Sequence, residues 1–221
     1  MKAVIFDIDN TLVDFLKLKE SCIKPAVAAM VKKGLKVSEE EGVKLIYDLY
    51  KVYGMEYKLI FQEMLKKIGQ FDHAILAAGI LAYRQSRVVK PYPGVVRVLD
   101  ELKKKGMKLA IVSDAPSLKA YLRLVSMEID DYFDVIVTYD DTNLEKPAKL
   151  PFEKALKELG VAPQEVVMLG DRPEKDVVGA KKMGFVSVFA LYGNEEVGKG
   201  ESGADHEIEK IEDLLEVMES L

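Results

Sequence analysis

The sequence predicts an α/β fold, in which helices cover both faces of a parallel β-sheet and a helical module is inserted after the first strand. Three observations support this prediction. Short apolar runs alternate with helical patterns from about residue 94 onward, which is typical of a parallel sheet. Residues from about 14 to 88 show helical patterns only. A Pro-rich stretch at 90–94, KPYPG, marks the return to the alternating pattern.

Five apolar runs are the predicted strands of the sheet. They are Ala3–Ile5, Lys108–Val112, Val135–Thr138, Val166–Leu169 and Val186–Ala190. Four predicted helices, at 94–105 and at about 116–126, 151–159 and 173–183, connect or flank the later strands. The first of these helices places its apolar residues at helical spacing, and Gly106 follows it as a stop signal.

Further helices are predicted in the inserted module and at the end of the chain. Ser38 and Glu41 form a predicted capping box, followed by apolar residues on one helix face. The other predicted helices are 13–33, 56–68, 71–87 and an amphipathic helix at 207–221. These patterns predict two domains, one made of residues 1–13 and 89–221 and the other of residues 14–88.

The composition excludes several classes of protein. Of the 221 residues, 49% are hydrophobic and 31% are charged, as expected for a globular protein with a core. No apolar run reaches the length of a membrane span. The net charge of −5 is dispersed along the chain, so we expect no nucleic-acid partner. With a single cysteine, Cys22, and no secretion pattern, we expect a cytoplasmic protein, with a monomer as the default.

Polar side chains follow the predicted strands at the edge where parallel sheets bind ligands, beyond their carboxyl ends. In chain order these residues are Asp7, Asp9, Ser113, Lys146, Asp171 and Asp176. Alternate strand residues share a face, so Asp7 and Asp9 are expected to lie close together and repel each other. A solvated turn explains FDIDNTL on its own, but not the convergence of polar groups from four strand ends.

The chemistry of these residues fits phosphoryl transfer. A cluster of Asp7, Asp9 and Asp171 needs a cation, and an all-oxygen ligand set favours Mg²⁺ over zinc. A carboxylate can attack phosphorus to form an aspartyl-phosphate, and a second carboxylate can exchange protons with the leaving group and with water. Ser113 and Lys146 can hold the phosphoryl oxygens.

The motifs resemble those of the haloacid dehalogenase superfamily of hydrolases. The similarity rests on the DIDNT stretch at 7–11, Ser113, Lys146 with Pro147, and the GDRPEKD stretch at 170–176. Their order and spacing agree with the family over about residues 1–190. The resemblance implies a Rossmann-like, doubly wound parallel sheet with a small α-helical cap that closes over the carboxyl edge of the strands.

The resemblance also implies a role for each matching residue. Asp7 is the expected nucleophile and Asp9 the general acid and base, with its backbone carbonyl on the metal. Ser113 and Lys146 are expected to bind the transferred phosphoryl group. Asp171 is an expected ligand of Mg²⁺, together with Asp7. Asp176 is expected to orient Lys146 or a metal-bound water without binding the metal itself.

The expected function is that of a Mg²⁺-dependent phosphoric monoester hydrolase acting on a small phosphorylated metabolite. Three alternatives remain open at this point: a 2-haloacid dehalogenase, a phosphomutase and a non-catalytic binding protein of the same fold. Dehalogenation releases halide, which needs neither a proton donor nor a metal, so Asp9 and Asp171 favour the phosphatase. Many relatives carry Asn at position 114, where this chain has Asp114, and we expect that side chain to face the cap or solvent.

Overall fold

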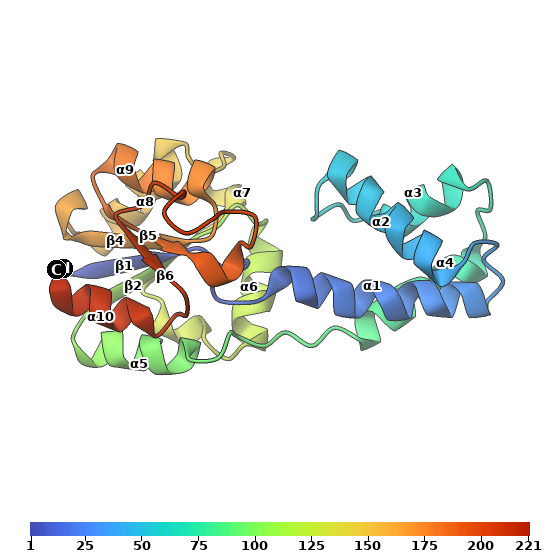
Figure 1. The fold of residues 1–221 in the computed structure, drawn as a ribbon, viewed down its shortest axis with the longest axis horizontal. Helices are drawn as coiled ribbons and strands as arrows, with labels where there is room; N and C mark the ends of the chain where they lie inside the picture. The colour runs from blue at the N-terminus through green and yellow to red at the C-terminus, as the bar shows by residue number, and fades with distance from the viewer. The chain divides into compact units, whose positions relative to one another are not determined.

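The computed structural model describes all residues from 1 to 221, and the chain divides into two units (Figure 1). One unit comprises residues 1–14 and 89–221, and the other comprises residues 15–88. The domain boundaries predicted from the sequence fall after residues 13 and 88, whereas the units divide after Asp14 and Val88. Each unit has its own hydrophobic core.

The larger unit is built on a six-stranded sheet in which every neighbouring pair is parallel. The strand order is β3-β2-β1-β4-β5-β6. The strands are β1 (Ala3–Phe6), β2 (Lys108–Val112), β3 (Val135–Val137), β4 (Val166–Gly170), β5 (Val186–Ala190) and β6 (His206–Ile208). The central strands β1 and β4 are buried along their whole length, because helices cover both faces. The predicted α/β fold with a parallel sheet is therefore confirmed.

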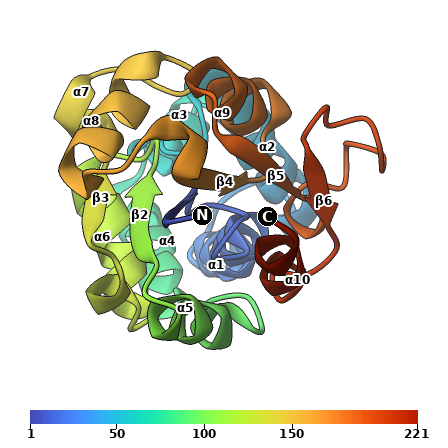
Figure 2. The ribbon, with the colours of Figure 1, turned by 90° about the vertical axis from the view of Figure 1, so that its left-hand side faces the viewer.

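Helices pack on the two faces of this sheet (Figure 2). The helices α8 (Lys149–Leu159) and α9 (Val178–Met183) lie on one face, and α5 (Val95–Lys104) and α10 (Asp213–Ser220) lie on the other. The remaining helices of this unit are α6 (Ser117–Ser126), which follows β2, the short α7 (Tyr139–Thr142), and a π-helical turn at Pro173–Val177 that leads into α9.

The alternating side chains of the strands explain the two faces. Ile5, Val112 and Met168 point to the face that α8 covers, where they pack around Phe152 of that helix. The intervening strand residues, such as Phe6, are equally buried against the opposite layer. Strands buried on both faces read as unbroken apolar runs, which is why the sequence predicts them well.

The sixth strand and α7 are absent from the sequence prediction. The strand β6 has the sequence HEI and pairs with β5 from Val188 to Ala190. A segment of three residues, two of them polar, is too short to show the alternating pattern of a strand. The formation of β6 therefore depends on its pairing with β5. It falls at the start of the predicted amphipathic helix at 207–221, of which only Asp213–Ser220 is helical.

The smaller unit consists of four helices. They are α1 (Phe15–Lys32), α2 (Glu39–Tyr53), α3 (Ile60–Lys67) and α4 (His73–Gln85). The predicted capping box is present, since Ser38 Oγ accepts from the N–H of Glu41 and the Glu41 carboxylate accepts from the N–H of Ser38. None of the helices in the chain combines the length and the apolar character needed to cross a membrane.

Candidate active site

The loop after β1 begins with Asp7, whose N–H donates to the carbonyl of Leu169 at 2.9 Å. This bond continues the β1–β4 pairing one residue beyond the strand, so the Asp7 side chain starts from a rigid backbone. The chain then turns sharply, with Asn10 in the left-handed region (φ 58°) and the Leu12 N–H bonded to the Ile8 carbonyl. The Tyr192 hydroxyl donates to the Thr11 carbonyl at 2.8 Å, which ties this turn to the loop after β5.

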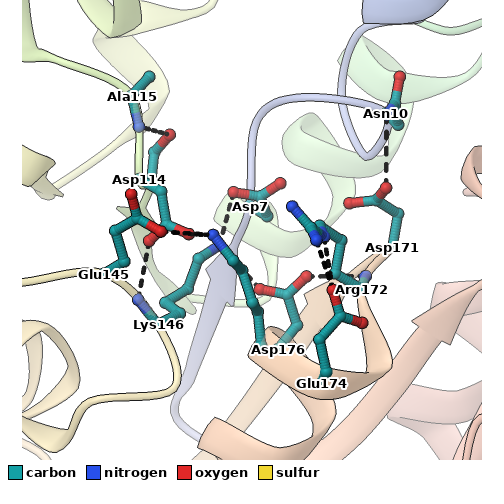
Figure 3. Close-up of polar contacts among 12 residues, drawn as sticks. Asp7, Asn10, Asp114, Ala115, Glu145, Lys146, Asp171, Arg172, Glu174 and Asp176 are labelled. Atoms are coloured by element: carbon teal, nitrogen blue, oxygen red, sulfur yellow. Dashed lines mark hydrogen bonds and ion pairs between the residues drawn. The ribbon is translucent and has the colours of Figure 1, made fainter. Parts of the chain in front are cut away.

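Lys146 is the cation at the centre of the site (Figure 3). Its Nζ lies 2.6 Å from Asp7 Oδ1 and 2.7 Å from Asp176 Oδ1, and only 3% of the side chain is exposed. Burial lowers the pKa of Lys146, but the carboxylates of Asp176 and Asp7 outweigh it and hold the pKa above its ordinary value. Lys146 is therefore charged, and it joins the loops that follow β1, β3 and β4.

Three carboxylates converge beside Lys146. One oxygen each of Asp7, Asp171 and Asp176 lies within 4.8 Å of the others, and all three residues are buried. Burial, reinforced by Asp7 and Asp176, raises the pKa of Asp171 to about 8. Burial also raises the pKa of Asp176 to about 6, because Lys146 offsets only part of it. The protein groups alone therefore disfavour the ionised forms of Asp171 and Asp176, which a bound cation would favour.

The donor set fits a divalent cation. Asp171 Oδ2 accepts a long hydrogen bond from Asn10 Nδ2 at 3.4 Å, while its buried Oδ1 has no hydrogen-bond partner. Both oxygens of Asp176 are engaged, one by Lys146 and the other by the Arg172 N–H at 3.0 Å. Asp171 thus has a free oxygen for a metal ion, and oxygen ligands suit a hard cation such as Mg²⁺.

The close packing of Asp176 against β4 depends on Gly170, the last residue of that strand. A Cβ atom at position 170 would overlap the carboxylate of Asp176. The π-helical turn at Pro173–Val177 places Asp176 against this glycine, and its carboxylate lies 2.7 Å from Lys146 Nζ.

Ser113 and Asp9 lie on the same loops as expected but make other contacts. Ser113 follows β2 and is buried, and its Oγ accepts from the Ala115 N–H at 3.2 Å. Asp9 Oδ1 lies 3.1 Å from Nε of Arg123 on α6, whereas Asp7 Oδ1 lies 2.6 Å from Lys146 Nζ.

The structure contradicts the expectation for Asp114. Both of its carboxylate oxygens are bonded within the larger unit: Oδ1 accepts from the Lys146 N–H at 2.8 Å, and Oδ2 accepts from Lys175 Nζ at 2.6 Å. Lys175 Nζ also donates to Glu145 Oε2 at 2.8 Å. Lys175 thus pairs with the extra anion, and Asp114 anchors the backbone of Lys146.

Four residues that contact the site received no role from the sequence. Asn10 and Lys175 lie within the DIDNT and GDRPEKD motifs, but the contact between Lys175 and Asp114 becomes visible only in the fold. Arg123 and Asn194 lie outside all four motifs, although Asn194 Nδ2 donates to the Asp171 carbonyl at 2.9 Å.

Comparison with known proteins identifies the family. The family model for haloacid dehalogenase-like hydrolases matches residues 4–190. The chain belongs to this family. Within it, the chain resembles phosphatases, and hydrolysis of phosphoric monoesters is its activity class.

Relatives and a solved structure cover nearly the whole chain. The glyceraldehyde 3-phosphate phosphatase of Pyrococcus abyssi is 34% identical over 225 residues, covering 100% of this chain and 94% of the relative. The enzyme of the same name from Methanocaldococcus jannaschii is 30% identical over 224 residues, with coverage of 100% and 98%. The crystal structure of a phosphatase of this superfamily from Thermococcus onnurineus superposes with a TM-score of 0.72 at 28% identity, covering 99% of this chain and 98% of that one.

Proposed function

We propose that the chain is a Mg²⁺-dependent phosphatase that uses Asp7 as the nucleophile and Asp9 as the general acid and base. The observation that carries this proposal is the buried Lys146, which holds Asp7 and Asp176 beside the unpartnered oxygen of Asp171. Clustering three buried carboxylates costs stability, and a site that binds a cation and an anionic substrate uses that charge.

The first half-reaction transfers the phosphoryl group to the protein. The Asp7 carboxylate attacks phosphorus, the bond from phosphorus to the ester oxygen breaks, and the electron pair stays on that oxygen. The ester oxygen takes a proton from Asp9 and departs as the alcohol. Lys146 and Ser113 stabilise the negative charge on the phosphoryl oxygens.

The second half-reaction regenerates the nucleophile. The Asp9 carboxylate takes a proton from water, the water oxygen attacks phosphorus, and the bond between phosphorus and Asp7 breaks. Inorganic phosphate leaves and both carboxyl groups return to their starting states. Asp9 thus donates a proton in one half-reaction and accepts one in the other.

The side chains of Asp7 and Asp171, with the backbone carbonyl of Asp9, are the proposed ligands of Mg²⁺. When bound, the ion neutralises the carboxylates and the phosphoryl group so that they can approach each other. Asp176 is proposed not to bind the ion directly, because Lys146 and the Arg172 N–H already contact its two oxygens. Asp176 keeps Lys146 oriented toward Asp7.

We assign the choice of substrate to the helical unit, residues 15–88, acting as the cap domain. The proposed substrate class is a small phosphate ester of three carbons, with glyceraldehyde 3-phosphate as its first candidate. The support for this choice is that relatives from two archaea that align over the entire chain carry that activity in their names. A cytoplasmic setting, as expected from the single cysteine, completes the proposal, with a monomer as the default.

The test is a paired assay on the purified protein. One arm measures phosphate release from glyceraldehyde 3-phosphate and from p-nitrophenyl phosphate, with Mg²⁺ and then with a chelator. The other arm measures halide release from 2-chloropropionate. The proposal requires phosphate release that chelation abolishes; halide release without metal would replace it with the dehalogenase alternative.

A further inference from the structure

A buried arginine contacts the carboxylate that handles the proton. Arg123 lies on α6, the helix that follows the Ser113 loop, and only 3% of its side chain is exposed. Its Nε lies 3.1 Å from Asp9 Oδ1. Neither partner belongs to the Lys146 cluster, so this ion pair is a second electrostatic element at the same edge of the sheet.

A packing role alone does not explain an arginine at this position. Its buried neighbours on α6 are Ala120 and Leu124, and an apolar side chain would fill the same space without the cost of desolvating a guanidinium. Arginine is almost never buried without a partner. The ion pair with Asp9 supplies one, which links the buried charge to the carboxylate.

We propose that Arg123 is a positioning residue that orients Asp9 for proton transfer. This inference rests on the role of Asp9 in the proposed function. A guanidinium stays protonated in proteins and cannot relay the proton itself. Through its contact with Oδ1, the guanidinium fixes the orientation of the Asp9 carboxyl group, and a general acid transfers a proton only when it is correctly placed. The Asp9 side chain is 24% exposed, and its contact with the buried guanidinium restricts its rotation.

The proposal makes a specific prediction about the leaving group. p-Nitrophenolate departs without a proton, whereas an alkoxide needs one, so only alkyl esters depend on a correctly placed acid. The quantity kcat/KM for phosphate release reports the steps up to transfer onto Asp7, where this proton moves. A misplaced acid therefore lowers kcat/KM for an alkyl phosphate and leaves that for the aryl phosphate nearly unchanged.

The experiment compares Arg123→Met and Arg123→Lys with the wild type on glyceraldehyde 3-phosphate and p-nitrophenyl phosphate. Arg97→Met is the matched control, since Arg97 is an exposed arginine on α5. For Arg123→Met we expect kcat/KM to fall about 10–100-fold on the alkyl ester, because a misplacement of about 1 Å can cost about 100-fold. On the aryl ester the expected fall is below about threefold.

Two further measurements separate positioning from folding. Arg123→Lys restores part of the selectivity between the esters, and in an Asp9→Asn background Arg123→Met causes no additional loss on the alkyl ester. If Arg123→Met does not fold, as judged by circular dichroism, the Arg123→Lys variant carries the comparison, with a smaller but still selective loss.

Equal losses on both esters, or no loss on the alkyl ester, would overturn the positioning role while the proposed function stands. A rise in KM on both esters would likewise overturn it and assign Arg123 to binding the phosphate. A wild-type protein that releases no phosphate from either ester would instead overturn the proposed function, and this inference with it.

Discussion

Replacing Lys146 by methionine removes the cation that joins three loops of the site. The methionine side chain has a similar length, so the change is mainly one of charge. In the wild-type protein Lys146 Nζ lies 2.6 Å from Asp7 and 2.7 Å from Asp176, and the ammonium is buried. Without it, two buried carboxylates face each other and Asp171 with no internal counter-charge.

The magnitude follows from the cost of breaking a buried ion pair. Removing one partner of such a pair costs about 3–5 kcal/mol. Because 1 kcal/mol shifts Tm by about 2–4 °C in a protein of this size, we expect Tm to fall by roughly 10 °C in the absence of metal. Mg²⁺ should recover part of the loss, because it replaces some of the missing positive charge. Turnover should fall by about 100- to 1,000-fold even with Mg²⁺, the usual effect of removing one group that stabilises transition-state charge.

The assay is thermal unfolding followed by circular dichroism, with chelator and then with Mg²⁺, together with phosphate release from p-nitrophenyl phosphate. Lys149→Met is the matched control, since Lys149 is exposed at the start of α8, three residues further along the chain. It should change neither Tm nor turnover appreciably. If Lys146→Met unfolds within about 2 °C of the wild type in chelator, a cost of less than about 1 kcal/mol, the electrostatic account of the cluster is wrong.

Three other changes test the same site. Gly170→Ala should abolish turnover and lower Tm, because the added Cβ overlaps the Asp176 carboxylate. Gly106→Ala is the control: its Cβ meets open space, and its positive φ, which Gly170 does not share, makes its Tm loss that of backbone strain alone. Gly106→Ala should leave turnover unchanged. In chelator, the pKa values of Asp171 (about 8) and Asp176 (about 6) lie above their ordinary value of 3.8. The folded state therefore binds protons more tightly than the unfolded state. As a result, the free energy of unfolding should fall as pH rises from about 4 to 8. Denaturant titrations should therefore show a pH slope that Asp171→Asn flattens and that Mg²⁺ reverses at the alkaline end; a slope unchanged by Asp171→Asn would contradict the assignment. Asp9→Ala should retain far less activity on an alkyl phosphate than on an aryl phosphate, and near-full activity on the alkyl ester would show that another group is the acid.

The sheet could be predicted because its strands are buried on both faces. Ala3–Phe6 and Val166–Gly170 are apolar runs bounded by polar loops, and their pattern is independent of their neighbours. The strand His206–Ile208 forms only because Val188–Ala190 offers an edge for pairing. That information is tertiary, and no local pattern in HEI contains it.

The candidate site was predictable for a different reason. In a parallel sheet the carboxyl ends of all strands lie at one edge, so Asp7, Lys146 and Asp171 could be expected at that edge from the strands they follow. The orientation of Asp114 could not, because it depends on Lys175, which lies 61 residues further along the chain. Arg123 escaped prediction because a helix pattern indicates which face is buried but not which partner a charged residue on that face meets.

The central claim is that Asp7 carries the phosphoryl group during turnover. The most direct measurement uses Asp9→Asn, in which the loss of the base slows hydrolysis of the intermediate while p-nitrophenolate still departs without an acid. The variant is mixed with p-nitrophenyl phosphate and Mg²⁺, quenched in acid within the first turnover, and digested for peptide mass spectrometry. The account predicts a burst of p-nitrophenolate that matches the enzyme concentration and a phosphoryl group on Asp7. A phosphoryl group on another residue such as Ser113, or turnover without any covalent intermediate, would contradict it.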